Sequence, residues 1–290
     1  MTCLADGHGL EPKIDGSVMI HQEGTFMNID FWESIQPSAL FEAIAEQDNV
    51  EFVQQVLKKL TPDPIFTGMI IDLINNNGIE LRLVVSWLAK VLHPNNYLEV
   101  GVRRGFSMAM VASRCPDVEL FGFDNWIRNY VGVKNPGPRF VQSEMRKIGY
   151  EKKISFINGN SHQTLPAFFK SNSGGLRNLP GIKMITGSKS RPSMFDLIVI
   201  DGDHSILGAY QDLVDTMPYC TPGGVIVFDD IAPDLSNLDP AAIQREMGPD
   251  PHGWHNLLGV WDAIKHRFPN FRYFDYMQNP PGVGLAVRLE

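Results

Sequence analysis

The sequence predicts an α/β protein whose largely parallel sheet carries carboxylates at one edge. Two acidic segments indicate this, residues 195–204 (FDLIVIDGDH) and residues 223–230 (GGVIVFDD). Each is a short apolar run, rich in β-branched residues, that ends in carboxylates, as a buried parallel strand does when it delivers acids to its carboxyl edge. In open α/β sheets ligands bind at that edge, so these clusters are the first candidates for a functional site.

Short apolar runs alternate with helical patterns throughout the chain after Pro94. Because helical stretches lie between most of these runs, βαβ crossovers and a mostly parallel sheet are expected. The predicted strands are residues 97–100, 119–123, 154–157, 195–200, 225–228, 271–276 and 284–289.

The region before Pro94 is predicted to be helical. Apolar residues recur at helical spacing within residues 37–60, and Pro62 and Pro64 end that pattern. A second helix is expected at residues 80–92. We therefore expect residues 1–93 to form a helical cap or oligomerisation region, in a homodimer or higher assembly, although core packing alone explains the apolar faces equally well.

Composition excludes several classes of protein. The net charge of −8, with no basic cluster, argues against binding to nucleic acid or to an anionic membrane. Three cysteines without a pairing pattern predict neither a disulfide framework nor a zinc site, which fits a reducing compartment. The start of the chain lacks the pattern of a signal peptide, and no apolar run approaches the roughly 20 residues of a membrane span. A cytoplasmic protein is expected.

The first predicted strand runs into a glycine-containing turn, Glu99-Val-Gly101-Val-Arg-Arg-Gly105-Phe-Ser107, followed by a helical pattern. Glycines there allow the backbone and a helix N-terminus to approach a ligand closely. The second strand ends at Asp124, about twenty residues further on, where a carboxylate can accept hydrogen bonds from both ribose hydroxyls. The alternative for Asp124 is an exposed turn or a helix cap.

These motifs, followed by residues 158–161 (NGNS), resemble those of class I S-adenosylmethionine-dependent methyltransferases. The resemblance covers about residues 97–289. It implies a Rossmann-like, seven-stranded, mostly parallel sheet with an N-terminal helical cap, in which residues 94–290 form the S-adenosylmethionine-binding methyltransferase domain.

In that family the glycine loop lies beside the methionine part of the cofactor, the acid of the second strand holds the ribose, and the residue after the third strand meets the adenine. Many relatives have Asp at the position of Asn160, whose carbonyl oxygen can still accept a hydrogen bond from the adenine amino group. Arg103 and Arg104, inside the loop, either contact the cofactor carboxylate or face solvent. The cofactor-binding residues that the resemblance implies are Glu99, Gly101, Val102, Gly105, Ser107, Asp124, Asn125, Trp126, Gly159, Asn160, Ser161 and Asp201.

The acidic clusters indicate a subclass. Asp201, Asp229 and Asp230 offer hard oxygen ligands suited to Mg²⁺. This arrangement resembles metal-dependent O-methyltransferases of the catechol type and the sugar-modifying enzymes of macrolide and aminocoumarin pathways, where the metal binds two adjacent substrate oxygens. His204 matches the histidine base of those sugar enzymes, with Asp201 as its catalytic companion. Asp203 is either a further ligand or a group that orients His204. The alternative for His204 is a helix-start histidine that only packs or positions a neighbour.

The leading hypothesis is a metal-assisted O-methyltransferase acting on a hydroxylated small molecule, such as a sugar-like compound or another natural product. A metal-independent methyltransferase acting on nitrogen or another acceptor is the alternative. An NAD-type oxidoreductase fits less well, because the loop reads Gly-x-x-x-Gly and not Gly-x-Gly-x-x-Gly. Two long segments are expected to matter: residues 170–193 as a functional loop or insertion, and residues 231–253 as a lid whose His252 could contact substrate, together with the nearby His255.

Overall fold

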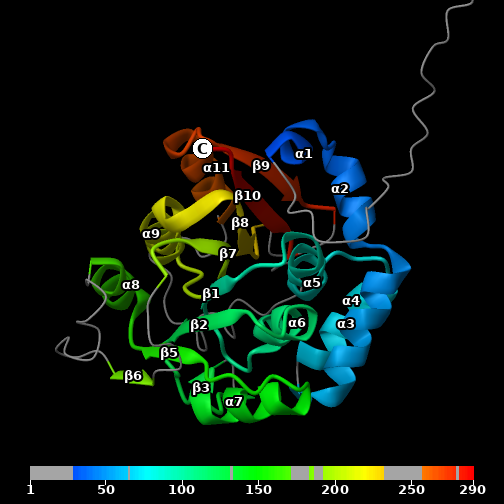
Figure 1. Ribbon diagram of the computed structural model, residues 1–290, viewed down its shortest axis with the longest axis vertical. Helices are drawn as coiled ribbons and strands as arrows, with labels where there is room; N and C mark the ends of the chain where they lie inside the picture. The colour runs from blue at the N-terminus through cyan, green and yellow to red at the C-terminus, as the bar shows by residue number, and fades with distance from the viewer. Residues whose placement is uncertain are drawn as a thin grey trace, which may run out of the picture.

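The computed structural model describes residues 29–64, 66–130, 133–170, 183–185, 192–231, 257–278 and 281–290. An eight-stranded sheet crosses the centre of the molecule, with helices packed on both of its faces (Figure 1). The strand order is β6-β5-β2-β1-β7-β8-β10-β9. The strands are β1 (Asn96–Val100), β2 (Glu119–Asp124), β5 (Ser155–Asn158), β6 (Lys183–Ile185), β7 (Phe195–Ile200), β8 (Cys220–Asp229), β9 (Phe271–Tyr276) and β10 (Val283–Arg288).

All seven predicted strands are present, and the sheet is mostly parallel as predicted. Strands β5, β2, β1, β7 and β8 are parallel, whereas β10 runs antiparallel to both of its neighbours. The eighth strand, β6, adds an antiparallel edge beside β5 and comes from the segment predicted to be a loop or insertion. The order of the parallel strands reverses between β1 and β7, which is where ligands bind in sheets of this kind.

Two helical layers cover the sheet. The hydrophobic core is correspondingly divided into two clusters, one on each face. One layer holds α3 (Gln47–Lys59), α5 (Leu81–Leu92), α6 (Phe106–Arg114) and α7 (Pro138–Lys147), and the other holds α8 (Ser161–Lys170), α9 (Ile206–Thr216) and α11 (Leu257–Arg267). The remaining elements are α1 (Ile29–Ser34), α2 (Pro37–Ile44), α4 (Phe66–Asn75), η2 (Met217–Tyr219) and the hairpin of β3 (Asn129–Tyr130) and β4 (Val133–Lys134).

The helical pattern of residues 37–60 is interrupted in the structure. It forms two helices, α2 and α3, because Glu46 adopts extended backbone between them, with φ −53° and ψ 142°. The break lets α2 bury Leu40, Phe41 and Ile44 near β9 while α3 packs on α5 and α6. Tertiary packing thus overrides a local periodicity that continues through the break.

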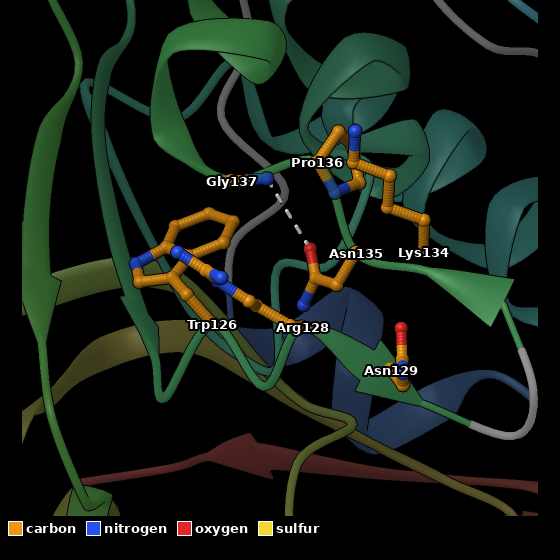
Figure 2. Close-up of a pocket in the computed structure, with 7 residues that line it drawn as sticks. All are labelled: Trp126, Arg128, Asn129, Lys134, Asn135, Pro136 and Gly137. Atoms are coloured by element: carbon orange, nitrogen blue, oxygen red, sulfur yellow. Dashed lines mark hydrogen bonds between the residues drawn. The ribbon is translucent and has the colours of Figure 1, made fainter.

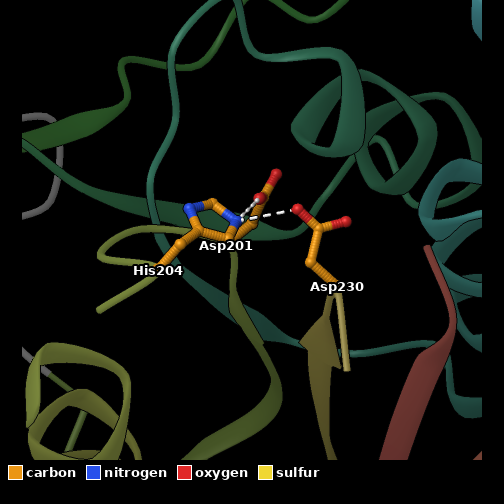
Figure 3. Close-up of side chains that lie close together, drawn as sticks. All are labelled: Asp201, His204 and Asp230. Atoms are coloured by element: carbon orange, nitrogen blue, oxygen red, sulfur yellow. Dashed lines mark ion pairs between the residues drawn. The ribbon is translucent and has the colours of Figure 1, made fainter. Parts of the chain in front are cut away.

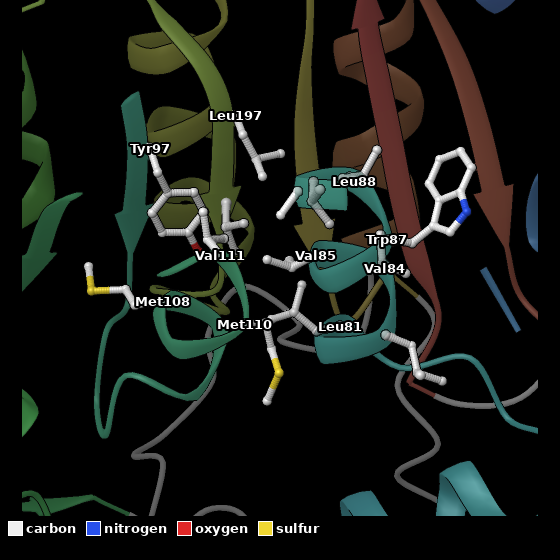
Figure 4. Packing of buried hydrophobic residues seen from close by; sticks show 14 of the residues in the cluster. Leu81, Val84, Val85, Trp87, Leu88, Tyr97, Met108, Met110, Val111 and Leu197 are labelled. Carbon is white, nitrogen blue, oxygen red and sulfur yellow. The ribbon is translucent and has the colours of Figure 1, made fainter. Parts of the chain in front are cut away.

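Helix α5 lies at the centre of the N-terminal region. The predicted helix of residues 80–92 is confirmed, with Glu80 capping it by accepting hydrogen bonds from the backbone N–H groups of Arg82 and Leu83. Ten of its 12 residues are buried, and Figure 4 shows its apolar side chains packed with those of β1, α6 and β7. This part of the N-terminal region therefore shares the core of the sheet. Among the described residues, no helix has both the length and the apolar character that crossing a membrane requires.

Candidate active site

The glycine loop joins β1 to α6 and lies directly against the end of β7. Gly101 has a φ of +92°, and a Cβ atom there would fall 1.8 Å from the backbone oxygen of Asp201. No other residue fits that contact without moving the backbone. Gly105, with a φ of +77°, is the N-cap of α6, and Val102 and Ser107 are buried within the loop and the first turn. The loop and the first acidic cluster are thus parts of one site.

Glu99 lies on β1 just before this loop and is buried. It accepts a hydrogen bond of 3.0 Å from the hydroxyl of Tyr97. Burial, reinforced by the charge of Asp201, raises the pKa of Glu99 well above its usual value. A cationic group near Glu99 would favour its ionised form.

Asp124, at the end of β2, is held beside the glycine loop by backbone amides. Its Oδ2 accepts a hydrogen bond of 2.7 Å from the N–H of Arg103, and its Oδ1 accepts one of 2.5 Å from the N–H of Trp126. Burial raises the pKa of Asp124, although these amide hydrogen bonds favour the carboxylate. Asn125 is exposed next to it. Asp124 is therefore fixed in place at the sheet edge.

The end of β5 is adjacent, since Asp124 pairs in register with Asn158. Gly159, with a φ of +140°, donates its N–H to the carbonyl of Asp124 at 3.1 Å. Asn160 is exposed, and its side-chain oxygen accepts a hydrogen bond from the N–H of His162 at the start of α8, which Ser161 begins. The predicted ribose and adenine residues are thus neighbours at the same edge.

The two acidic clusters meet at the ends of β7 and β8. His204 Nε2 lies 2.9 Å from Asp230 Oδ2 and 3.6 Å from Asp201 Oδ1, and Figure 3 shows the three side chains converging. One ligand atom from each of the three lies within 4.8 Å of the others. Asp230 adopts a left-handed backbone with a φ of +58°. Such a strained residue at a sheet edge is typical of functional sites.

The charges of this cluster are strongly coupled. Burial opposes protonation of His204, but the hydrogen bond with Asp230 and the charges of Asp230, Asp201 and Asp229 raise its pKa to about 9. Burial, opposed by His204 and reinforced by Asp230, raises the pKa of Asp201 to about 6. At neutral pH the imidazole is therefore protonated in this arrangement.

A family model described as a methyltransferase domain matches residues 98–231, the stretch that runs from β1 through both acidic clusters. Residues 98–231 are thus similar to methyltransferase domains. The mostly parallel sheet and the glycine loop after β1 are the features expected from the sequence motifs. A search of curated proteins finds no match.

Solved structures resemble this chain at low sequence identity. The O-methyltransferase TomG from Streptomyces achromogenes, involved in tomaymycin synthesis and in complex with SAM, is 14% identical over 80% of this chain and 92% of its own, with a TM-score of 0.48. The SAH-bound methyltransferase PaMTH1 from Podospora anserina is 15% identical over 84% and 89%, with a TM-score of 0.49. The O-methyltransferase from Bacillus cereus in complex with SAH is 16% identical over 84% and 92%, with a TM-score of 0.45.

Asp229 is next to Asp230 in the sequence but is not one of the compact group of Asp201, His204 and Asp230. Its side chain is buried, and its Oδ1 has no hydrogen-bond partner among the described residues. Burial and the charges of Asp230 and Asp201 raise the pKa of Asp229 well above its usual value, opposed by Arg82. The compact group in the structure is thus Asp201, His204 and Asp230, whereas the sequence predicted Asp201, Asp229 and Asp230 as metal ligands.

Arg82 was not singled out from the sequence. It stands in the first turn of α5, forms an ion pair of 3.1 Å with Glu80, and faces the charges of Asp229 and Asp201. Nothing local in the sequence marks this arginine as part of the site, because Asp201 and Asp229 are more than a hundred residues away along the chain. It brings a positive charge, on a side chain that is 18% exposed, from the N-terminal region to the acidic end of the site.

Asp203 faces a second histidine. His162 Nε2 lies 3.8 Å from Asp203 Oδ2 and 3.5 Å from Asp212 Oδ1, and Asp212 is fully buried. Asp203 Oδ1 also accepts a hydrogen bond of 2.9 Å from the N–H of Ser205, the N-cap residue of α9. These contacts direct Asp203 toward the adenine end of the predicted cofactor site.

A cavity of about 520 Å³ opens beyond Asp124, beside the β3 and β4 hairpin (Figure 2). Trp126 forms one wall, with its ring packed edge-on against Phe156 at 5.6 Å between centroids. The cavity is lined by Trp126, Arg128, Asn129, Lys134, Asn135, Pro136 and Gly137. The proposed lid with His252 lies outside the described residues except at Ile231, and so does the nearby His255.

Proposed function

We propose that this methyltransferase transfers a methyl group to a hydroxyl oxygen of a small molecule, such as a sugar-like or other natural-product acceptor. The observation that carries the proposal is the convergence of Asp201, His204 and Asp230 next to the glycine loop. It supports the proposal because a candidate base and two carboxylates lie next to the loop that is expected to receive the cofactor. Transfer to oxygen needs such groups, because a neutral hydroxyl must lose its proton to become a good nucleophile.

The proposed cofactor site runs along the edge formed by β1, β2 and β5. Glu99 and the loop from Gly101 to Gly105 would receive the methionine part, where the cationic amino group suits a buried carboxylate. Asp124 would hold the ribose, since a carboxylate has acceptor positions beyond the two that backbone amides fill. The adenine would lie near Asn160. The other proposed contacts are Val102, Ser107, Asn125, Trp126, Gly159, Ser161 and Asp201.

The acidic end of the site fits a divalent cation. Three aspartates gather there, burial and mutual repulsion raise the pKa of Asp201 and Asp229, and a buried oxygen of Asp229 lacks a partner among the described residues. We propose Asp201, Asp229 and Asp230 as oxygen ligands for Mg²⁺, with His204 beside them. When bound, such a cation supplies a lowered pKa for a coordinated hydroxyl.

His204 is the proposed general base. A base must be neutral to accept a proton, whereas the surrounding carboxylates raise the pKa of His204 to about 9. If a bound cation compensated the negative charges of Asp201 and Asp230, the pKa of His204 would fall toward the pH at which the enzyme works. Asp230, 2.9 Å from Nε2, would then orient the ring.

The test is calorimetric titration of S-adenosylmethionine with Mg²⁺ and with a chelator, followed by methyl transfer to a panel of vicinal diols. We expect cofactor binding in both conditions and turnover only with the metal. Asp229→Asn should abolish most turnover and the separate heat of Mg²⁺ binding. The exposed control Asp117→Asn should behave as the parent. Unchanged turnover of Asp229→Asn would overturn the metal assignment, and absence of cofactor binding would contradict the methyltransferase site.

A second candidate function is metal-independent methylation of nitrogen or another acceptor. The close pair of His204 and Asp230 favours it, because a carboxylate that orients an imidazole can support proton transfer without a metal. Full activity in the presence of a chelator would select this function.

A further inference from the structure

The segment of residues 61–64, between α3 and α4, contacts the glycine loop through a buried carboxylate. Only 1% of the Asp63 side chain is exposed. Its Oδ2 lies 3.1 Å from Arg103 Nη2 and 3.7 Å from Arg104 Nε. Both arginines of the loop are therefore paired with one aspartate of the N-terminal region.

Each of the two guanidinium groups also packs on an aromatic ring. Arg103 lies over the ring of Phe66 at 4.0 Å from the centroid, and Arg104 lies over the ring of Phe140 at 4.7 Å. Arg104 Nη2 also donates a hydrogen bond of 3.4 Å to the carbonyl of Pro62. A planar guanidinium held between a carboxylate and an aromatic face has little freedom to turn.

The backbone of Arg103 reaches the ribose end of the cofactor site. Its N–H donates the 2.7 Å hydrogen bond to Asp124 Oδ2. Arg103 has a φ of +50°, a left-handed conformation that is unfavourable for a residue with a Cβ. Such a conformation persists only where the surroundings hold it, and the anchored side chain provides that hold.

We propose that Asp63 is a positioning residue of the cofactor site. By holding the side chain of Arg103 it keeps that residue in its left-handed conformation, with the N–H directed at Asp124. The N-terminal region thereby sets the affinity for the ribose of S-adenosylmethionine. This inference rests on the proposed assignment of Asp124 to the ribose, and it gives the two arginines a role that needs no direct contact with the cofactor.

The contact of Asp63 with the loop arginines can be removed while the other contacts that hold residues 61–64 in place remain. Thr61 is fixed to α7 by hydrogen bonds to both carboxylate oxygens of Glu144, at 2.6 and 3.1 Å, and by one of 2.7 Å from Lys147. Asp63 Oδ1 accepts a hydrogen bond of 3.0 Å from the N–H of Phe66 at the start of α4. Asparagine is an equally good residue at a helix start, so Asp63→Asn keeps this cap and removes the ionic hold on the loop.

The experiment measures dissociation constants of S-adenosylhomocysteine and of its analogue that lacks both ribose hydroxyls. The proteins are the parent, Asp63→Asn, Arg103→Met, the double variant, and Asp72→Asn, which removes the same charge from an exposed position of α4. We expect Asp63→Asn to weaken S-adenosylhomocysteine binding about tenfold. The analogue should lose less than about twofold, because it has no hydroxyls for Asp124 to hold.

The double variant tests whether the effect of Asp63 on cofactor binding passes through Arg103. If Asp63 acts through Arg103, the double variant binds no more than about twofold more weakly than Arg103→Met, because the two losses are one interaction. Thermal unfolding of each variant shows which proteins remain folded, and Arg103→Met provides the test even if Asp63→Asn is unstable.

Three results would overturn the proposal. The first is an affinity of Asp63→Asn for S-adenosylhomocysteine equal to that of the parent. The second is an equal loss of affinity for S-adenosylhomocysteine and for the analogue. The third is a loss of affinity in the double variant that equals the product of the losses in the two single variants. A parent protein that binds neither ligand would instead refute the proposed cofactor site, so the two failures are distinguishable.

Discussion

The pair of His204 and Asp230 predicts a stability that depends on pH. The structure raises the pKa of His204 from 6.5 to about 9, with the hydrogen bond to Asp230 as its largest favourable cause, and only 16% of the histidine side chain is exposed. Because the folded pKa is raised, this contribution is fully present below pH 6.5 and is lost as the pH rises through 9.

The magnitude follows from the shift. Since each tenfold change in proton affinity is worth about 1.36 kcal/mol, raising the pKa of His204 from 6.5 to about 9 corresponds to about 3 kcal/mol of stability at pH 6. The charges of Asp201 and Asp229 also raise the pKa of His204, so Asp230 accounts for only part of this stability. Asp230→Asn should therefore lower the free energy of unfolding by about 1 to 3 kcal/mol at pH 6 and by much less at pH 9.5. That change is a large fraction of the free energy of unfolding of a typical domain, about 5 to 15 kcal/mol.

The assay is urea unfolding of the parent and Asp230→Asn at pH 6, 7.5 and 9.5, with a chelator present throughout. Asp117→Asn removes a fully exposed carboxylate as the control and should change the free energy of unfolding little at any pH. An equal loss of stability at pH 6 and pH 9.5 would refute the reasoning, because the loss would then come from packing and not from the protonated imidazole.

Further predictions concern the loop, the cofactor and the N-terminal region. Gly101→Ala should unfold at a markedly lower temperature in a calorimetric scan, since its Cβ meets the backbone oxygen of Asp201; an unchanged melting temperature would contradict this contact. Asp124→Ala should weaken S-adenosylmethionine binding at least tenfold by calorimetry, by about 1.4 kcal/mol or more. His204→Ala should lose most turnover in a methyl-transfer assay while keeping cofactor affinity within about threefold, which separates base from binding residue. The fragment 94–290 should lack a cooperative unfolding transition by circular dichroism, because it removes α5, ten of whose 12 residues are buried.

Much of the fold could be predicted because its signals are local. Each central strand is a short apolar run that ends at a polar or acidic residue, and β7 with Asp201 and β8 with Asp229 show this most clearly. Strand β6 escaped prediction because it is three residues long and lies in a polar segment rich in glycine and serine. The break at Glu46 escaped because neither glycine nor proline marks it.

The site was predictable to the extent that strand ends share an edge. Asp124, Asn160 and the acidic clusters follow strands whose order the βαβ pattern suggests, so their proximity could be expected. Arg82 and Asp63 could not be predicted in the same way. Their partners are distant in the sequence, and a charged residue in an amphipathic helical region ordinarily faces solvent.

The N-terminal region thus reaches both ends of the proposed site with opposite charges. Asp63 brings a carboxylate to the arginines of the glycine loop, and Arg82 brings a guanidinium to the buried acids at the ends of β7 and β8. Asp63 is buried and Arg82 is 18% exposed, and a charge removed from water is tolerated only where partners of opposite sign compensate it. A sheet that carries this loop and these acids therefore needs a partner layer with the complementary charges. Changes in residues 61–82 should accordingly alter cofactor affinity and the charge of the catalytic end, even though the family match begins only at residue 98.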